Sequence, residues 1–581
     1  MQRIAQFFSR HYLAVVLAIL VGVAVVFPQI QFIFQAGGQY HGFNIFETDG
    51  EYYYDARIRE IYDGHYLMSN PLLAGKDLPF VYSPLPEFVM GMTGRILHLN
   101  LIQILILFRF LAPAGLFLLI YFLILRLTNG RKPVALLAAT FILLASNLVS
   151  YPGQLFSMLR GTFHAEQFTD FARPVNPQLS AFFFFGFLYA YWRLIETNQK
   201  KYFYWSLIIY GLSFYVYQYS WTFLTVFLGL NGALFLWQKK KALFKKTLLV
   251  FGGGLVLATP YFINFYRATQ HFSYQNLVLY NGLYQSHKSV FSLILLAAII
   301  LLVPLYKLAQ NKNLFWFFAA LVASGWVVIN QQVITGQAIQ LGHYHWYFNR
   351  PVFILLAVIV FFSLLRRASA KQFYQYAALG IAAAVAFFNV YQVQATSYRH
   401  HFETYLKLQD YYPVIDWLNK NATRDQVAYI PESRLNQLVP MYTSLNVYYD
   451  VKAPLSLQQY KDYDRYNLFL KLKLQNVSPK DLPAHLRANE ALLAETYGIY
   501  FKSRGLNYQD VPEEWLVALQ KDYEEFYKIS WEDILTKYPL GYIIWDKTDL
   551  ADLPLEKIVQ EANFKPVYDS GGVVIYQKTS D

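Results

Sequence analysis

Residues 12–34, YLAVVLAILVGVAVVFPQIQFIF, decide the class of fold. This stretch carries no charged residue and exceeds the roughly 20 residues that a helix needs to cross about 30 Å of hydrocarbon. It is also longer than the apolar core of a signal peptide, and no small-x-small cleavage site follows it. We therefore interpret it as a membrane span that the protein keeps.

Similar apolar blocks recur along the next part of the chain, which is 56% hydrophobic and 15% charged overall, unlike an ordinary soluble protein. With the first block they predict a polytopic α-helical membrane protein of about 11 spans. The fifth and sixth blocks are short and nearly continuous, so a single kinked helix is an alternative there. The blocks after the first are residues 101–125, 134–149, 179–195, 203–217, 221–237, 247–266, 290–306, 314–334, 351–365 and 373–392.

Basic residues indicate the orientation of these spans. The short loops rich in lysine and arginine all lie on one side if the fifth and sixth blocks form a hairpin, and merging those blocks breaks the pattern. The positive-inside rule then places the N-terminus in the cytoplasm and, with an odd number of spans, the C-terminal part outside the cytoplasm. The basic loops are residues 131–132, 200–201, 239–246, 307–312 and 366–371.

The net charge of +12 is therefore mainly an orientation signal. The lysines flank helices and form no stripe interleaved with exposed aromatic residues, so we expect no nucleic-acid partner. The chain has no cysteine, which excludes disulfides, thiolate metal sites and cysteine nucleophiles.

Residues 396–581 have a different composition, because more than half of the charged residues lie there in less than a third of the chain. They predict a soluble extracytoplasmic α/β domain, distinct from a membrane domain of residues 1–395. Short apolar runs at 427–430 and 542–545 are typical of buried strands. Two further β-rich runs, 566–568 and 573–576, are joined by Asp569-Ser570-Gly571-Gly572 and predict a closing hairpin.

The first external loop, residues 35–100, holds most of the acidic residues of the membrane half and includes the stretch TDGEYYYDARIREIYDGHY. Tyr54, Ile58 and Ile61 recur at helical spacing and predict an amphipathic helix at the membrane surface that ends near Asp63-Gly64. Thr48 and Glu51 match a capping box. Asp49, in the first turn, would complement the helix dipole.

The acidic residues of the membrane half, Glu196 excepted, are predicted to lie on the outer face, where they also suit a site that binds a cation or accepts a proton. Glu166 and Asp170 in the second external loop share one face if their segment is helical. Hard carboxylate oxygens suit Mg²⁺ or Mn²⁺, and such a cation would neutralise a lipid phosphate. A solvated loop without a site is the alternative for this pair.

Basic residues near the same boundary are candidates for contacting a lipid phosphate. Arg173 lies directly before the fourth span and Arg350 before the tenth, where a guanidinium fork could hold phosphate. His343 and His345 belong to the same aromatic loop as Arg350 and are too weak a pattern for zinc. Helix capping, snorkelling and an interfacial aromatic belt are the alternatives. Arg109, inside the second block, is expected to face protein or water.

The first loop, with Asp49 in TDGEYYYDARIRE and the proline-rich YSPLPEF beyond it, resembles the GT-C superfamily of polytopic glycosyltransferases. Its members include oligosaccharyltransferases, protein O-mannosyltransferases and lipid A aminoarabinose transferases. The run from Asp49 to Arg57 and Arg59 is similar to the Asp-x-Tyr…Arg segment of oligosaccharyltransferases. The resemblance implies a polyprenyl-phosphate sugar donor and makes Asp49 the catalytic or metal-binding aspartate of the first loop.

On this basis we expect an inverting transferase of the cell envelope whose acceptor is an extracytoplasmic saccharide, lipid or protein. Asp49 would act as catalytic base or metal ligand, and Glu51, Tyr52 and Tyr53 would contact the acceptor or the sugar. A polytopic transporter or flippase is the alternative, although it would need ionisable residues within its spans. A non-enzymatic scaffold would leave the first-loop acids as helix caps only.

Overall fold

The computed structural model describes residues 2–48, 50–281, 283, 285–368, 372–431, 433–493, 511–548 and 555–579. The chain divides into two compact units, and each is described by itself. Unit 1 consists of Met1–Glu51, Tyr82–Ile263 and Ser286–Tyr405. Unit 2 consists of Tyr52–Val81, Asn264–Gln285 and Leu406–Asp581.

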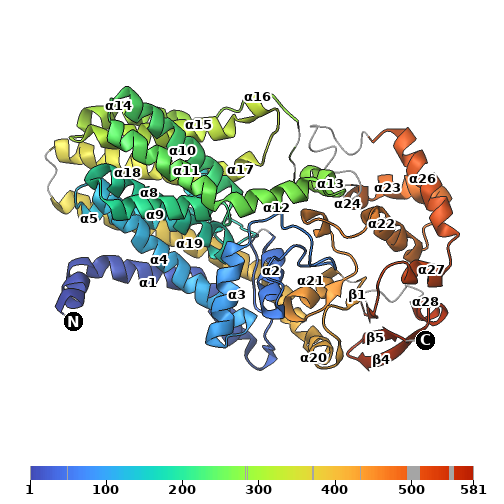
Figure 1. Ribbon diagram of the computed structural model, residues 1–581. Helices are drawn as coiled ribbons and strands as arrows, with labels where there is room; N and C mark the ends of the chain where they lie inside the picture. The colour runs from blue at the N-terminus through green and yellow to red at the C-terminus, as the bar shows by residue number, and fades with distance from the viewer. Residues whose placement is uncertain are drawn as a thin grey trace. The chain divides into compact units, whose positions relative to one another are not determined.

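Unit 1 is helical. Neighbouring helices pack as the pairs α1–α4, α8–α9, α9–α11, α10–α15 and α14–α18 (Figure 1). Its elements are α1 (Gln2–Ala36), η1 (Gly37–Gln39), α3 (Leu85–Leu97), α4 (Leu101–Leu127), α5 (Lys132–Leu144), α6 (Asn147–Ser150), α7 (Gly153–Leu159), η2 (Asp170–Ala172), η3 (Pro174–Leu179), α8 (Ser180–Thr197), α9 (Lys200–Ser213), α10 (Gln218–Trp237), α11 (Lys241–Leu257), the first part of α12 (Thr259–Thr269), α14 (Leu293–Leu308), α15 (Lys312–Ile329), α16 (Gln332–Thr335), α17 (Leu341–Tyr344), η4 (His345–Asn349), α18 (Arg350–Arg367) and most of α19 (Gln372–Leu408).

Every predicted apolar block coincides with one of these helices or with two adjacent ones. Within the described residues, six helices are long and apolar enough to cross a membrane, and a seventh span results if the bent pair α11 and α12 counts as one. Two further apolar helices, α5 and α14, are shorter. The protein is a multi-pass helical membrane protein, while the number of eleven spans stays a prediction.

The fifth and sixth blocks form two helices, α9 and α10, and not one kinked helix. Between them Tyr217 has extended backbone torsions, so the helical hydrogen-bond ladder stops there. The rings of Phe214 and Trp221, on either side of the break, stack with centroids 4.5 Å apart. The charge pattern required the fifth and sixth blocks to be separate helices, and the structure has two separate helices there.

Unit 2 surrounds a five-stranded sheet of order β2-β1-β3-β5-β4. Strands β2, β1 and β3 are parallel neighbours, and β5 runs antiparallel to β3 and β4. The elements are α2 (Glu51–Asp63), α13 (Tyr274–Tyr280), η5 (Gln409–Tyr411), α20 (Tyr412–Asn421), β1 (Val427–Tyr429), α21 (Ser433–Tyr442), β2 (Asn446–Val447), η6 (Ala453–Leu455), α22 (Tyr463–Leu474), η7 (Pro479–Asp481), α23 (Leu482–Ala488), α24 (Glu490–Leu493), α26 (Glu513–Tyr527), α27 (Trp531–Thr536), β3 (Tyr542–Asp546), α28 (Leu555–Glu561), β4 (Phe564–Ser570) and β5 (Val573–Lys578).

The predicted hairpin near the C-terminus is confirmed by β4 and β5 (Figure 1). Its turn depends on Gly571 and Gly572, whose φ angles are 62° and 83°. Side chains rarely adopt such torsions, and two successive left-handed residues match the twist of antiparallel strands. The apolar runs that predicted buried strands coincide with β1 and β3.

The first external loop is structured, as predicted, but it does not stay with one unit. Residues Tyr52–Val81 belong to unit 2, whereas the sequence indicated a single boundary between residues 395 and 396.

Helix α2 ends at Asp63 and is followed by Gly64 with a φ of 89°, as expected. The prediction of an amphipathic surface helix is wrong. Its polar residues Asp55, Arg57 and Glu60 are as buried as Ile58, because α2 packs inside unit 2.

Candidate functional site

The candidate site is built around residues 170–176, which lead from the second external loop of unit 1 into α8. The segment forms the turn η2 and the start of η3, where Pro174 and Pro177 have no N–H to donate. A second irregular helix, η4, precedes α18. Both η3 and η4 are of the wide π type, which is frequent at functional sites.

Three buried arginines of unit 1 converge on this segment. Arg109 comes from α4, Arg173 from the segment itself and Arg350 from the start of α18, and none of the three is more than 6% exposed. Arginine is seldom buried unless it is paired, and each of the three guanidinium groups has at least one acceptor here. The contacts are Arg350 Nη1 to Asp170 Oδ2 at 3.3 Å, Arg109 Nη1 to the carbonyl of Ala172 at 2.7 Å, and Arg173 Nε to the carbonyl of Asn176.

Arg350 keeps a donor free for a ligand. Its Nε is buried and has no hydrogen-bond partner among the described residues. A buried donor without an acceptor costs about 1–3 kcal/mol, so an anion that accepts from it would bind favourably. The phosphate contact predicted for Arg350 therefore has a group available to make it, and the role itself stays a prediction.

Arg109 is committed to the protein, as expected for a charge inside a span. It forms a buried ion pair with Glu51, and its guanidinium carbon lies 4.6 Å from the centroid of the Phe46 ring. The Glu51 carboxylate also accepts from the N–H of Thr48 at 3.1 Å and from its hydroxyl at 2.7 Å. The part of the capping box in which Glu51 accepts from Thr48 is confirmed. Little capacity remains on Glu51 for a sugar.

Glu47 ties the first loop to the second loop and to α19. Its carbonyl accepts from the N–H of Phe168 at 3.0 Å. Its carboxylate accepts from the Tyr405 hydroxyl at 3.1 Å and lies 3.9 Å from His401 Nδ1. The backbone of Glu47 therefore contacts the second loop, whereas its carboxylate contacts α19.

Described residues on both sides of position 49 connect the first loop to the second loop. Glu47 contacts the second loop directly, and Glu51 does so through Arg109, which binds Ala172. Asp49 itself lies outside the described residues, so its predicted role stays a prediction.

The described residues do not fit the predicted Mg²⁺ or Mn²⁺ site. Glu166 is exposed and lies in a loop, so it shares no helical face with Asp170, whose carboxylate is paired with Arg350. Within the described part of the chain, no group of three or more His, Asp or Glu side chains could hold a metal ion. A divalent cation prefers several carboxylate or carbonyl oxygens.

The two histidines of the last external loop have different surroundings. The His343 ring stacks on Tyr219 with centroids 4.6 Å apart, and its Nδ1 hydrogen-bonds to the Tyr217 hydroxyl. His345 is half-buried. The stacked His343 is thus held in place by α10, which leaves its predicted phosphate contact without direct support.

Tyr52 and Tyr53 anchor α2 within unit 2. The Tyr52 hydroxyl donates to Asp450 at 2.8 Å, and the Tyr53 hydroxyl shares a 2.6 Å hydrogen bond with Ser456. Burial raises the pKa of the Asp450 carboxyl above its ordinary range, and it raises the pKa of Tyr53 to about 12. Both tyrosines are thus used in packing, and their predicted contacts with acceptor or sugar stay predictions.

Two buried polar residues, one in each unit, escaped the sequence interpretation. Gln178 is fully buried in η3 and donates to the carbonyl of Phe171 at 2.5 Å, while its Oε1 has no partner among the described residues. Asp450 is buried at the end of a polar stretch without any motif. Only the prolines around Gln178 signalled an irregular helix start, and nothing in the sequence signalled Asp450.

The fold and this site define a multi-pass helical membrane protein that buries three arginines around the segment leading into α8. No family model matches the chain, and no curated protein of similar sequence was found. Two solved structures are similar over 97% of this chain and 97% of their own: ArnT from Cupriavidus metallidurans bound to undecaprenyl phosphate, with a TM-score of 0.44, and the same protein in the apo state, with a TM-score of 0.42. Each is 12% identical to this chain, and at such values the likeness assigns no residue here a role.

Proposed function

We propose that this protein is an inverting membrane glycosyltransferase that moves a sugar from a polyprenyl-phosphate donor to an extracytoplasmic acceptor. The observation that carries the proposal is the convergence of three buried arginines on residues 170–176, with Arg350 Nε unpaired in the described part of the chain. Preorganised donors of this kind stabilise the charge that develops on a leaving phosphate. The sequence resemblance of the first loop to GT-C transferases supports the same reaction.

In the proposed step, the acceptor hydroxyl attacks the anomeric carbon from the face opposite the phosphate. The bond from this carbon to the phosphate oxygen breaks, and the polyprenyl phosphate leaves with the bonding electrons. Asp49 takes the acceptor proton as general base. Arg350 and Arg173 offset the negative charge of the leaving group. Arg173 belongs to the segment 170–176, which Arg350 contacts through Asp170.

The test is transfer from a synthetic polyprenyl-phosphate sugar by the purified full chain, compared with an Asp49→Asn variant. Loss of the base should abolish transfer while the thermal unfolding midpoint stays unchanged. Asp77→Asn is the matched control, because Asp77 is an exposed carboxylate of the same loop. Full transfer by Asp49→Asn would remove Asp49 from the mechanism, and no transfer by the unchanged chain from any such donor would refute the proposal.

Metal removal distinguishes two ways of neutralising the leaving phosphate. Because Asp170 is paired with Arg350 and Glu166 is exposed, we expect transfer to continue in excess EDTA. The rate is measured before chelation, after it, and after Mg²⁺ or Mn²⁺ is restored. A loss that either cation reverses would instead support the cation site predicted from the carboxylates.

Transport is less well supported as a function. A transporter needs ionisable groups within its spans that can change partners during the cycle. Arg109, the intramembrane charge singled out in the sequence, is fully buried in an ion pair with Glu51 and in a hydrogen bond to Ala172. Such a pair fixes a loop to a helix and offers no open site for cargo.

A further inference from the structure

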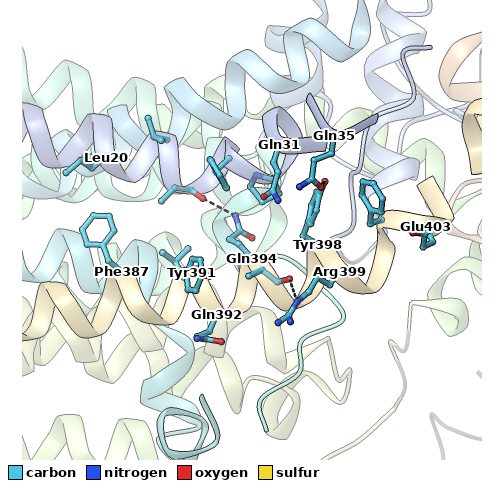
Figure 2. A pocket seen from close by; sticks show the side chains of 17 residues that line it. Leu20, Gln31, Gln35, Phe387, Tyr391, Gln392, Gln394, Tyr398, Arg399 and Glu403 are labelled. Atoms are coloured by element: carbon cyan, nitrogen blue, oxygen red, sulfur yellow. Dashed lines mark hydrogen bonds between the residues drawn. The ribbon is translucent and has the colours of Figure 1, made fainter. Parts of the chain in front are cut away.

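A groove of about 980 Å³ lies between α1 and α19, both of which are candidate membrane spans, in unit 1 (Figure 2). Its size is at the upper end of the roughly 300–1,000 Å³ typical of ligand sites. It is separate from the arginine segment described above, since none of Arg109, Arg173 and Arg350 lines it.

A specific contact holds the two helices together along the groove. Pro28 of α1 has no N–H, so the carbonyl of Ala24 one turn earlier loses its helical partner. The Nε2 of Gln394 on α19 donates to this carbonyl at 3.3 Å (Figure 2). It also donates to the carbonyl of Val25 at 3.1 Å. In lipid an unsatisfied carbonyl is costly, so this contact fixes the spacing of α1 and α19.

The groove is apolar at one end. Leu20, Val23 and Phe27 line it from α1, and Phe387 and Tyr391 line it from α19. Phe27 is 53% exposed and Tyr391 is 64% exposed, so no other described part of the protein covers them. An acyl chain is the natural neighbour of such a surface within a bilayer.

The other end is polar and carries both signs of charge. Gln31 and Gln35 line it from the end of α1, and Tyr398, Arg399 and Glu403 line it from α19 (Figure 2). Arg399 and Glu403 are one helical turn apart and exposed. The described contacts of the Arg399 side chain comprise one hydrogen bond, from Nε to the carbonyl of Ala395 at 3.2 Å, and no ion pair. Glu403 likewise has no ion pair among the described residues.

We propose that the groove binds a zwitterionic phospholipid whose headgroup carries a phosphate and a primary amine. The Arg399 guanidinium fits the phosphate oxygens through its remaining N–H donors, and the Glu403 carboxylate fits the ammonium group. The apolar end takes an acyl chain. A polyprenyl phosphate whose headgroup carries no amine matches the site less well, because nothing in it would offset the repulsion between the Glu403 carboxylate and its phosphate.

The experiment measures lipid binding to the delipidated full chain by native mass spectrometry, with phosphatidylethanolamine, phosphatidylcholine or phosphatidylglycerol of identical acyl chains. We expect phosphatidylethanolamine to bind about tenfold more tightly than phosphatidylglycerol, as a charge-assisted hydrogen bond to the amine implies. Phosphatidylcholine should also bind more weakly, because its quaternary amine has no N–H.

Two variants separate the contributions of the headgroup contacts. Arg399→Gln should weaken binding of all three lipids, and Glu403→Gln should remove the preference for phosphatidylethanolamine over phosphatidylglycerol. Lys407→Ala, an exposed cation on the same helix that does not line the groove, is the control and should change neither result.

Equal binding of the three lipids by the unchanged chain would indicate adventitious bilayer lipid only and would overturn the proposal. So would unaltered binding by Arg399→Gln, or a crosslink from Tyr391 to a second copy of the chain that lipid does not displace. Because binding is measured without sugar donor, failure here leaves the proposed glycosyl transfer untouched, and failure of transfer leaves this inference untouched.

Discussion

At the scale of single residues, the candidate site depends on the geometry of one guanidinium. Arg350 is 3% exposed and combines one ion pair with a free Nε donor, which lysine cannot reproduce because its ammonium is a point charge. We predict that Arg350→Lys lowers kcat/KM for sugar transfer about 10²-fold. Arg160→Lys, at an exposed arginine outside the site, should leave kcat/KM unchanged. Equal values for both variants would place Arg350 outside the reaction.

A second residue-scale prediction concerns pH and Asp450. Burial raises the folded-state pKa of this carboxyl above its unfolded value. The folded state therefore binds the proton more tightly, and the stabilisation is complete below the unfolded pKa and is lost as the pH rises through the folded one. Asp450→Asn cannot titrate, so its unfolding midpoint relative to the unchanged protein should rise between acidic and neutral pH. The exposed Asp410→Asn is the control, and a parallel pair of curves for Asp450→Asn would contradict the prediction.

At the scale of elements, proline and glutamine act together across two helices. Gln394 supplies the hydrogen bond that Pro28 removes from α1, at the carbonyl of Ala24. We predict that Gln394→Leu lowers the unfolding free energy in detergent by about 1 kcal/mol. Adding Pro28→Ala should recover part of the loss, because α1 then satisfies its own carbonyl. Additive effects of the two substitutions would contradict the predicted coupling between Pro28 and Gln394.

The irregular helices η3 and η4 show the same dependence on neighbours. Each precedes a longer helix whose first residues are buried, and the Arg350–Asp170 ion pair connects the residue after η4 to the turn before η3. Local sequence accounts for only half of this arrangement. Pro174 and Pro177 disrupt the start of α8, whereas no comparable breaker lies within η4.

At the scale of the whole molecule, unit 2 is assembled from three separate stretches of chain. The edge strand β2 donates from Val447 N to the carbonyl of Leu72, 2.9 Å away, in the first external loop. Leu457 packs with Ala268 and Leu277 from the middle of the chain. The stretch Leu406–Asp581 alone therefore lacks part of its core and the partner of its sheet edge.

We predict that a fragment of residues 406–581 does not reach the native state. Its uncovered sheet edge would favour aggregation, and the missing packing would expose apolar surface. Size-exclusion chromatography and near-ultraviolet circular dichroism of the fragment provide the measurement, with the full chain in detergent as reference. A monomer with a sharp, native-like aromatic spectrum would contradict the prediction.

Much of the architecture follows from sequence alone. The apolar blocks coincide with helices because about 20 uncharged residues in lipid must satisfy their backbone internally. The C-terminal hairpin follows from two glycines that tolerate left-handed torsions. The scarcity of acids within the apolar blocks follows from the cost of charge in hydrocarbon. These features depend on local composition and local backbone geometry, both of which can be read directly from the sequence.

Only the tertiary structure decided which loops serve which unit and what each charge contacts. The helical pattern of Tyr54, Ile58 and Ile61 predicted α2 correctly, but its polar residues are buried because chain several hundred residues away encloses them. Glu51 pairs with Arg109, and Asp170 with Arg350, across separations of 58 and 180 residues. The type of a charged residue and its spacing from its neighbours can be read from a sequence. Its partner depends on long-range packing, which no local pattern encodes.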